Sequence, residues 1–301
     1  MLEVLGFAVL LAIGPYQTGD IETSLKSLQE AQAKKDPELV KRLAAETCAL
    51  ARHQITDAEP ADADEKAAWK ERVAYARDVE LQTEYVLLAT ALVGPAAVTV
   101  DLMAALEQEN PKSRYLEQGY TRYLQALNQS GAAAKIPAVA EKGLANLPNQ
   151  EDLLAVMIEY SYGHKQSDRA LTYARRLIAA MEKRPKPEGI AAADWERKRT
   201  ASLSSGYWYA GIICGEKNLY VESNRDLRAA LPLIKGNDAM MGPALFYLGV
   251  VNFQLGRQTL NKKQVLEAVT SSQQAAKYTG PYTEQAWKNA MLIKTEADRM
   301  R

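Results

Sequence analysis

The chain has 301 residues, and its acidic and basic side chains balance at a formal net charge of zero. Because nucleic-acid-binding proteins normally carry a basic excess or stripe, this balance argues against nucleic acid as a partner. Strong helix formers dominate the composition, and no alternating β-branched runs lie between turn signals, so the sequence predicts an all-α protein.

The N-terminus carries the one feature that resembles a targeting signal. Val4 to Ile13 is an apolar run that is too short to span a bilayer, and small residues follow it at a spacing suited to cleavage. Residues 1–14 are therefore predicted to be a signal peptide, which implies a periplasmic or secreted protein. Since Glu3 stands where a basic residue is expected, the alternative is an apolar first helix in a cytoplasmic protein.

Residues 15–111 are predicted to fold into helical hairpins. Asp36-Pro37 indicates a helix start, since aspartate caps free amides and proline fits the first turn. Helix ends are expected at Gly94-Pro95 and at Asn110-Pro111. These hairpins are either diverged copies of the repeat that begins near residue 112 or unrelated to it.

From Lys112 onward, large and small apolar residues recur at a spacing typical of stacked helix pairs. The clearest stretch is 204–256, where Tyr207 and Leu227 are large residues and Gly211 is a small one between them. Gly249 occupies the corresponding small position of the next unit. Small residues let the two helices of a pair approach each other, and large residues fill the space between neighbouring pairs.

This pattern resembles the tetratricopeptide repeat, a helix pair of about 34 residues. The resemblance covers residues 112–281, with insertions near 183–200 and 257–265, and it is closest to bacterial members of the family. Residues 282–301 are similar to the C-terminal capping helix that such arrays need. The resemblance implies an α-α superhelix, a right-handed solenoid of antiparallel helix pairs.

The repeat register also implies a concave groove lined by the first helix of each pair. It assigns these side chains to the groove: Asp152, Glu159, Tyr162, Trp208, Ile212, Phe246, Val250 and Phe253. Within that set, Trp208, Phe246 and Phe253 are predicted to form an apolar strip that anchors a peptide or a helix. The alternative is that the C-terminal helix or the insertions cover this strip.

No catalytic constellation is visible in the sequence. The two histidines, His53 and His164, have no second histidine at metal-ligand spacing and no nucleophile arranged beside them. The two cysteines, Cys48 and Cys214, lie in apolar helical patterns and are predicted to be buried free thiols, with a disulfide as the open alternative. The sequence therefore predicts a non-enzyme without cofactor or metal.

These observations predict a scaffold or adaptor that binds a peptide or protein segment in its concave groove. No segment beyond the N-terminal run approaches the length of a membrane span. Two other interpretations stay open: an architectural protein that associates with itself, and the helical domain of an enzyme whose site the sequence does not reveal.

Overall fold

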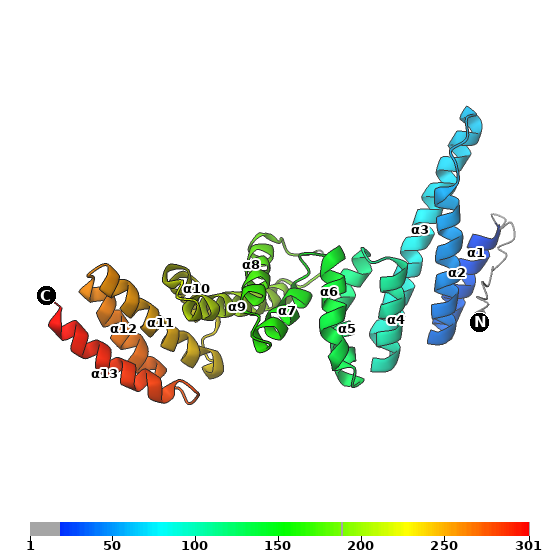
Figure 1. Ribbon diagram of the computed structural model, residues 1–301. Coiled ribbons are helices and arrows are strands. Elements are labelled where there is room, and N and C mark those ends of the chain that lie inside the picture. The colour runs from blue at the N-terminus through cyan, green and yellow to red at the C-terminus, as the bar shows by residue number, and fades with distance from the viewer. Residues whose placement is uncertain (1–18, 188, 301) are drawn as a thin grey trace, which may run out of the picture. The chain divides into compact units, whose positions relative to one another are not determined.

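The structure, a computed structural model, describes residues 19–187 and 189–300 (Figure 1). Within these ranges all regular structure is helical, with thirteen α-helices, one short 3-10 helix and no strand. The prediction of an all-α fold built from consecutive helix pairs is confirmed. The predicted signal peptide at 1–14 lies outside the described residues. The chain divides into two compact units, residues 1–135 and 136–301.

The first unit is a stack of helices in which each helix contacts the next and the next but one. Its elements are α1 (Gly19–Ala33), α2 (Pro37–Thr56), α3 (Ala63–Val93), α4 (Ala96–Glu109), α5 (Arg114–Gln129) and the 3-10 helix η1 (Ala133–Lys135). The predicted start at Asp36-Pro37 is present, since the Asp36 carboxylate accepts a hydrogen bond from the Leu39 amide at 3.0 Å. The predicted ends near Gly94 and Asn110 match the ends of α3 and α4.

The second unit contains α6 (Ile136–Asn146), α7 (Glu151–Gly163), α8 (Ser167–Lys183), α9 (Ala192–Glu216), α10 (Tyr220–Leu233), α11 (Asp238–Gln258), α12 (Lys262–Ala275) and α13 (Thr283–Arg299). Helices α7, α9, α11 and α13 each contact the next member of this set, and we call them the inner layer. Helices α6, α8, α10 and α12 contact chiefly inner-layer helices, and we call them the outer layer. Of the two predicted insertions, 183–200 runs from the end of α8 into the first residues of α9, and 257–265 runs from the end of α11 through the turn into the start of α12.

Two glycines of the repeat pattern lie where paired helices cross. A Cβ atom on Gly211 would lie 2.6 Å from the Leu227 side chain, so α9 and α10 meet at a distance that only glycine permits. A Cβ atom on Gly249 would collide with Ser272, where α11 meets α12. The small residues therefore do in this structure what the pattern predicts, since they set the spacing within each pair.

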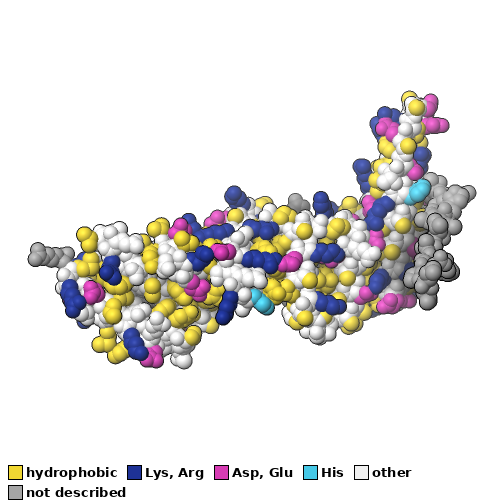
Figure 2. Space-filling view, viewed as in Figure 1, with side chains coloured by type: hydrophobic (Ala, Val, Ile, Leu, Met, Phe, Trp, Pro, Cys, Tyr) yellow, Lys and Arg dark blue, Asp and Glu magenta, His cyan; other side chains and the backbone are white. Residues whose placement is uncertain are grey.

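Arginine side chains connect successive outer-layer helices. Arg175 of α8 pairs with Asp226 of α10 at 2.6 Å, and Arg228 of α10 pairs with Glu267 of α12 at 2.7 Å. An arginine of α8 also pairs with an acid of α6 (Arg169 with Glu141). Figure 2 shows both basic and acidic side chains on the face in view. The long guanidinium side chains thus span gaps between helices that hardly touch one another.

Helix α11 is the one helix in the described ranges that is long and apolar enough to cross a membrane by length and composition. Half of its most apolar window is buried inside the protein. The helix contacts α9, α10, α12 and α13, and burial against neighbouring helices accounts for its apolar composition.

Candidate functional site

Two of the predicted groove residues are buried, and for these the prediction of a surface position is wrong. Ile212 is 1% exposed, in a core cluster with Leu227 and Leu248 between α9, α10 and α11. Phe246 is 4% exposed, and its ring stacks on that of Tyr282 with centroids 4.6 Å apart. Tyr282 immediately precedes α13, so the C-terminal region covers Phe246, which was the alternative interpretation.

The three aromatic residues of the predicted strip do not form one surface. Trp208 is half-buried, and its indole nitrogen donates a hydrogen bond to the Met240 carbonyl at 2.8 Å, which holds α9 against the start of α11. Phe253 packs instead against a separate cluster between α12 and α13, with the Arg257 guanidinium 5.5 Å from its ring centroid. The apolar strip is therefore replaced by contacts that hold the helices together.

The other predicted groove residues occupy varied positions. Val250 is half-buried and packs against the cluster that contains Phe246. Asp152 forms an ion pair with Lys198 at 3.0 Å. Glu159 is exposed on α7, although partial desolvation raises the pKa of its carboxyl. Burial, and then the charge of Glu159, raise the pKa of Tyr209 of α9.

Tyr162 belongs to a group of side chains that crosses the inner layer. Its hydroxyl donates a hydrogen bond to Glu216 Oε1 at 2.8 Å, and the Tyr247 hydroxyl donates to the same oxygen at 3.4 Å. The Tyr162 and Tyr209 ring centroids lie 5.3 Å apart, and those of Tyr247 and Tyr282 lie 5.7 Å apart. We call Tyr162, Tyr209, Tyr247, Tyr282 and Glu216 the tyrosine–Glu216 cluster. It joins α7, α9, α11 and the residue before α13.

Burial raises the pKa of two tyrosines of this cluster. Burial, and then the hydrogen bond to Glu216, raise the pKa of Tyr162. Burial is the largest cause that raises the pKa of Tyr247. Both hydroxyls are therefore protonated at neutral pH and act as donors to the carboxylate. The cluster is a half-buried aromatic surface that carries a negative charge at its centre.

Of the residues in this cluster, only Tyr162 was predicted from the sequence to line the groove. Tyr209 and Tyr247 each follow a residue that the register assigns to the groove, Trp208 and Phe246. An aromatic pair at the same place in two successive first helices was the signal that could have identified them. Tyr282 and Glu216 carry no such signal, because they lie at a helix start and a helix end.

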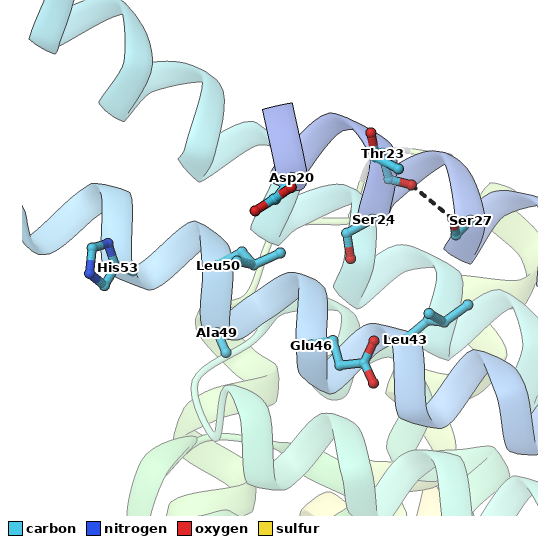
Figure 3. A pocket seen from close by; sticks show the side chains of 9 residues that line it. All are labelled: Asp20, Thr23, Ser24, Ser27, Leu43, Glu46, Ala49, Leu50 and His53. Carbon is cyan, nitrogen blue, oxygen red and sulfur yellow. Dashed lines mark hydrogen bonds between the residues drawn. The ribbon is translucent and has the colours of Figure 1, made fainter. Parts of the chain in front are cut away.

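A second candidate site is a pocket of about 440 Å³ between α1 and α2 in the first unit (Figure 3). Its α1 wall is polar, and its α2 wall combines Leu43 and Leu50 with Glu46 and His53. The Ser27 hydroxyl on the α1 side donates to the Thr23 carbonyl of its own helix at 2.9 Å. In Figure 3 His53 lies at one end of the pocket, away from the α1 hydroxyls, so these groups do not form a nucleophile–base pair.

The other histidine and the two cysteines interact with residues close to them. His164 follows the end of α7, where its Nδ1 lies 2.8 Å from the Tyr160 carbonyl. Cys48 and Cys214 are buried free thiols, as predicted, and burial, helped by the Glu109 charge, raises the pKa of Cys48 to about 12. Among residues 19–187 and 189–300, no group of three or more ligand side chains is placed to hold a metal ion.

Comparison with known proteins adds little to these observations. No protein-family model and no curated protein sequence matches the chain. One similar solved structure is described as "Computational Design of Self-Assembling Cyclic Protein Homooligomers". The alignment covers 93% of this chain and 92% of that chain, with 11% identity and a TM-score of 0.24. Such a low TM-score supports no conclusion about fold or function.

Proposed function

We propose that this chain is a non-catalytic scaffold of the tetratricopeptide-repeat type, which binds a segment of a partner protein along the inner layer of its second unit. The observation that carries this proposal is the tyrosine–Glu216 cluster, which crosses the inner-layer helices α7, α9 and α11 and reaches the residue before α13. Tyrosine rings offer large contact areas with few rotatable bonds, which makes them efficient anchors for a protein ligand.

The two layers of the second unit differ in which side chains remain accessible to a partner. In the outer layer, the basic side chains of Arg175 and Arg228 are engaged in pairs that connect helices. In the inner layer, the cluster tyrosines are half-buried and keep part of their surface in contact with solvent. An extended segment that lies across α7, α9 and α11 would cover this remaining surface.

The close approach of paired helices resembles tetratricopeptide-repeat packing, and this resemblance supports the same proposal. Gly211 and Gly249 lie at the crossings of consecutive helix pairs, where tetratricopeptide-type packing requires small residues. In arrays of this kind the first helices of the pairs line the concave face. In the proposed register α7, α9 and α11 of the inner layer are such first helices, and α13 is the capping helix.

A selection from a phage-displayed library of random linear peptides tests the proposal, with the full chain as the immobilised target. We expect peptides whose affinity falls at least tenfold for Tyr209→Ala. The matched control is Tyr173→Ala, which removes a half-buried tyrosine from α8 in the outer layer and should leave affinity unchanged. Equal affinity for both variants, in proteins of equal helicity, would move the binding surface away from the cluster.

A further inference from the structure

The charge at the centre of the tyrosine–Glu216 cluster indicates what kind of side chain it receives. We propose that the cluster binds an arginine of the partner segment, with the guanidinium against the Glu216 carboxylate and beside a tyrosine ring. This inference rests on the proposed function, since it names the chemistry of the partner at the same surface.

The Glu216 carboxylate is held by one of its oxygens and open at the other. Both tyrosine hydroxyls, from Tyr162 and Tyr247, donate to Oε1. Within the described part of the chain, Oε2 receives no hydrogen bond. A carboxylate can accept about four hydrogen bonds, so an acceptor remains in a fixed position at the surface.

No cation of the described residues neutralises this carboxylate. The next residue, Lys217, pairs instead with Asp168 at 2.6 Å. Glu159 adds a second exposed carboxylate beside Tyr209, and it also takes part in no ion pair among the residues the structure describes. The cluster therefore presents uncompensated negative charge next to aromatic rings.

The position of Glu216 is unfavourable for the isolated helix. Glu216 is the last residue of α9, where the helix dipole places partial negative charge and a basic residue would stabilise the end. The two tyrosine hydroxyls only partly offset this repulsion because they are neutral donors. A cation supplied by a partner would remove it.

Elsewhere this chain places its own arginines over its aromatic rings. Arg114 lies 4.8 Å from the centroid of the Tyr115 ring, and both Arg169 and Arg176 lie 5.7 Å from that of Tyr173. Among the described residues, no arginine lies over a ring of the cluster in this way. Among the described residues, the rings of the tyrosine–Glu216 cluster thus lie beside carboxylates and have no arginine over them.

Arginine fits this arrangement better than lysine does. The planar guanidinium can donate to a carboxylate and stack on an aromatic ring at the same time, whereas the ammonium of lysine is a compact and strongly hydrated charge. We therefore expect the binding peptides to share an arginine, and replacement of that arginine by lysine to weaken binding several-fold.

The test uses the peptides selected on the full chain, made synthetically and titrated by isothermal calorimetry against three proteins. Glu216→Gln keeps the shape of the side chain. It should weaken binding about tenfold, because one charged hydrogen bond is lost at a site that is partly exposed to solvent. Glu222→Gln removes the same charge from an exposed position on α10 and should leave affinity as in the wild type. Circular dichroism checks that both variants keep the wild-type helicity.

The outcomes separate the two proposals. Peptides that lack arginine, or that bind wild type and Glu216→Gln equally while still depending on Tyr209, would overturn the arginine site and leave the scaffold function standing. A selection that yields no binding peptide, or only peptides indifferent to Tyr209→Ala, would overturn the scaffold function and the arginine site together.

Discussion

Replacement of Phe246 by alanine is expected to loosen the C-terminal end of the second unit. Phe246 is 4% exposed, and its ring lies between Tyr247 and Tyr282, with centroids at 5.3 Å and 4.6 Å. Removal of a buried phenylalanine side chain costs about 3–5 kcal/mol, which includes roughly 0.5–1.5 kcal/mol from its aromatic neighbours. This loss should fall mainly on α13, whose main contacts are with α11 and α12.

Hydrogen exchange measured by mass spectrometry follows this local opening. If α13 loses about 3 kcal/mol of its stability against opening, its amides exchange roughly a hundredfold faster, because each 1.4 kcal/mol is a factor of ten. Amides of α7 and α8 should change much less, since a helical array transmits stability chiefly between neighbours. A global assay such as urea unfolding would mix these regions and hide the difference.

The control variant is Trp287→Ala on α13 itself. Trp287 is 59% exposed, so its removal should change stability by less than about 0.5–1 kcal/mol although the side chain is larger. If Trp287→Ala accelerated exchange in α13 as much as Phe246→Ala does, or if Phe246→Ala had no effect, Phe246 would not be the contact that holds this helix. The surface role in the groove would then have to be reconsidered.

Two other changes test contacts that hold the helices together, and a third measurement tests the burial of Cys48. Gly211→Ala should lower the free energy of unfolding by about 1–2 kcal/mol in chemical denaturation, because the added Cβ would lie 2.6 Å from the Leu227 side chain and 3.0 Å from its amide nitrogen. Asp226→Ala should cost about 2 kcal/mol in the same assay, since Asp226 is fully buried while its partner Arg175 keeps a third of its side chain exposed. Cys48 should resist iodoacetamide at pH 8 in the folded protein and react after unfolding, as mass spectrometry can show, because burial holds the pKa of its thiol near 12.

Each of these predictions has a control or a contrary outcome within the same chain. Gly163→Ala adds a methyl group at a position where nothing lies within 4 Å, so it should not destabilise the protein. Asp168→Ala removes an acid whose side chain is 87% exposed and should cost less than about 0.5–1 kcal/mol. Rapid alkylation of Cys48 in the folded protein would contradict its burial.

Above pH 9 the raised pKa of Cys48 should also make stability fall as pH increases toward 12, because the unfolded thiol ionises first.

The local features of the fold could be predicted because each depends on residues close together in sequence. The Asp36-Pro37 start is an example, since the cap and the amide it binds are three residues apart. The contact of Gly211 with Leu227 was implied by the repeat spacing, which encodes the crossing of two consecutive helices. The spacing of residues along the sequence predicts both the cap and the crossing, because helix geometry fixes the distances between residues a few positions apart.

The exposure of the groove residues could not be predicted in the same way. The repeat register predicts which face of a helix a residue occupies, but it does not predict which other side chains cover that face. Phe246 is covered by Tyr282, which is 36 positions further along the chain and outside any repeat position. Such coverage depends on where the connection between α12 and α13 runs, and no local pattern encodes that path. For the same reason the sequence did not bring Glu216 together with Tyr162.

The two layers of the second unit suggest why an arginine-bearing partner would be directed to the inner one. In the outer layer the chain supplies both members of each ion pair, as in Arg228 with Glu267, so a partner would have to displace an existing contact. At Glu216 the described residues supply only the anion, whose Oε1 accepts from two tyrosine hydroxyls. A partner cation there forms a new pair without breaking an old one. Binding that involves this exposed pair should therefore weaken as salt is raised, and the dependence should be reduced in Glu216→Gln.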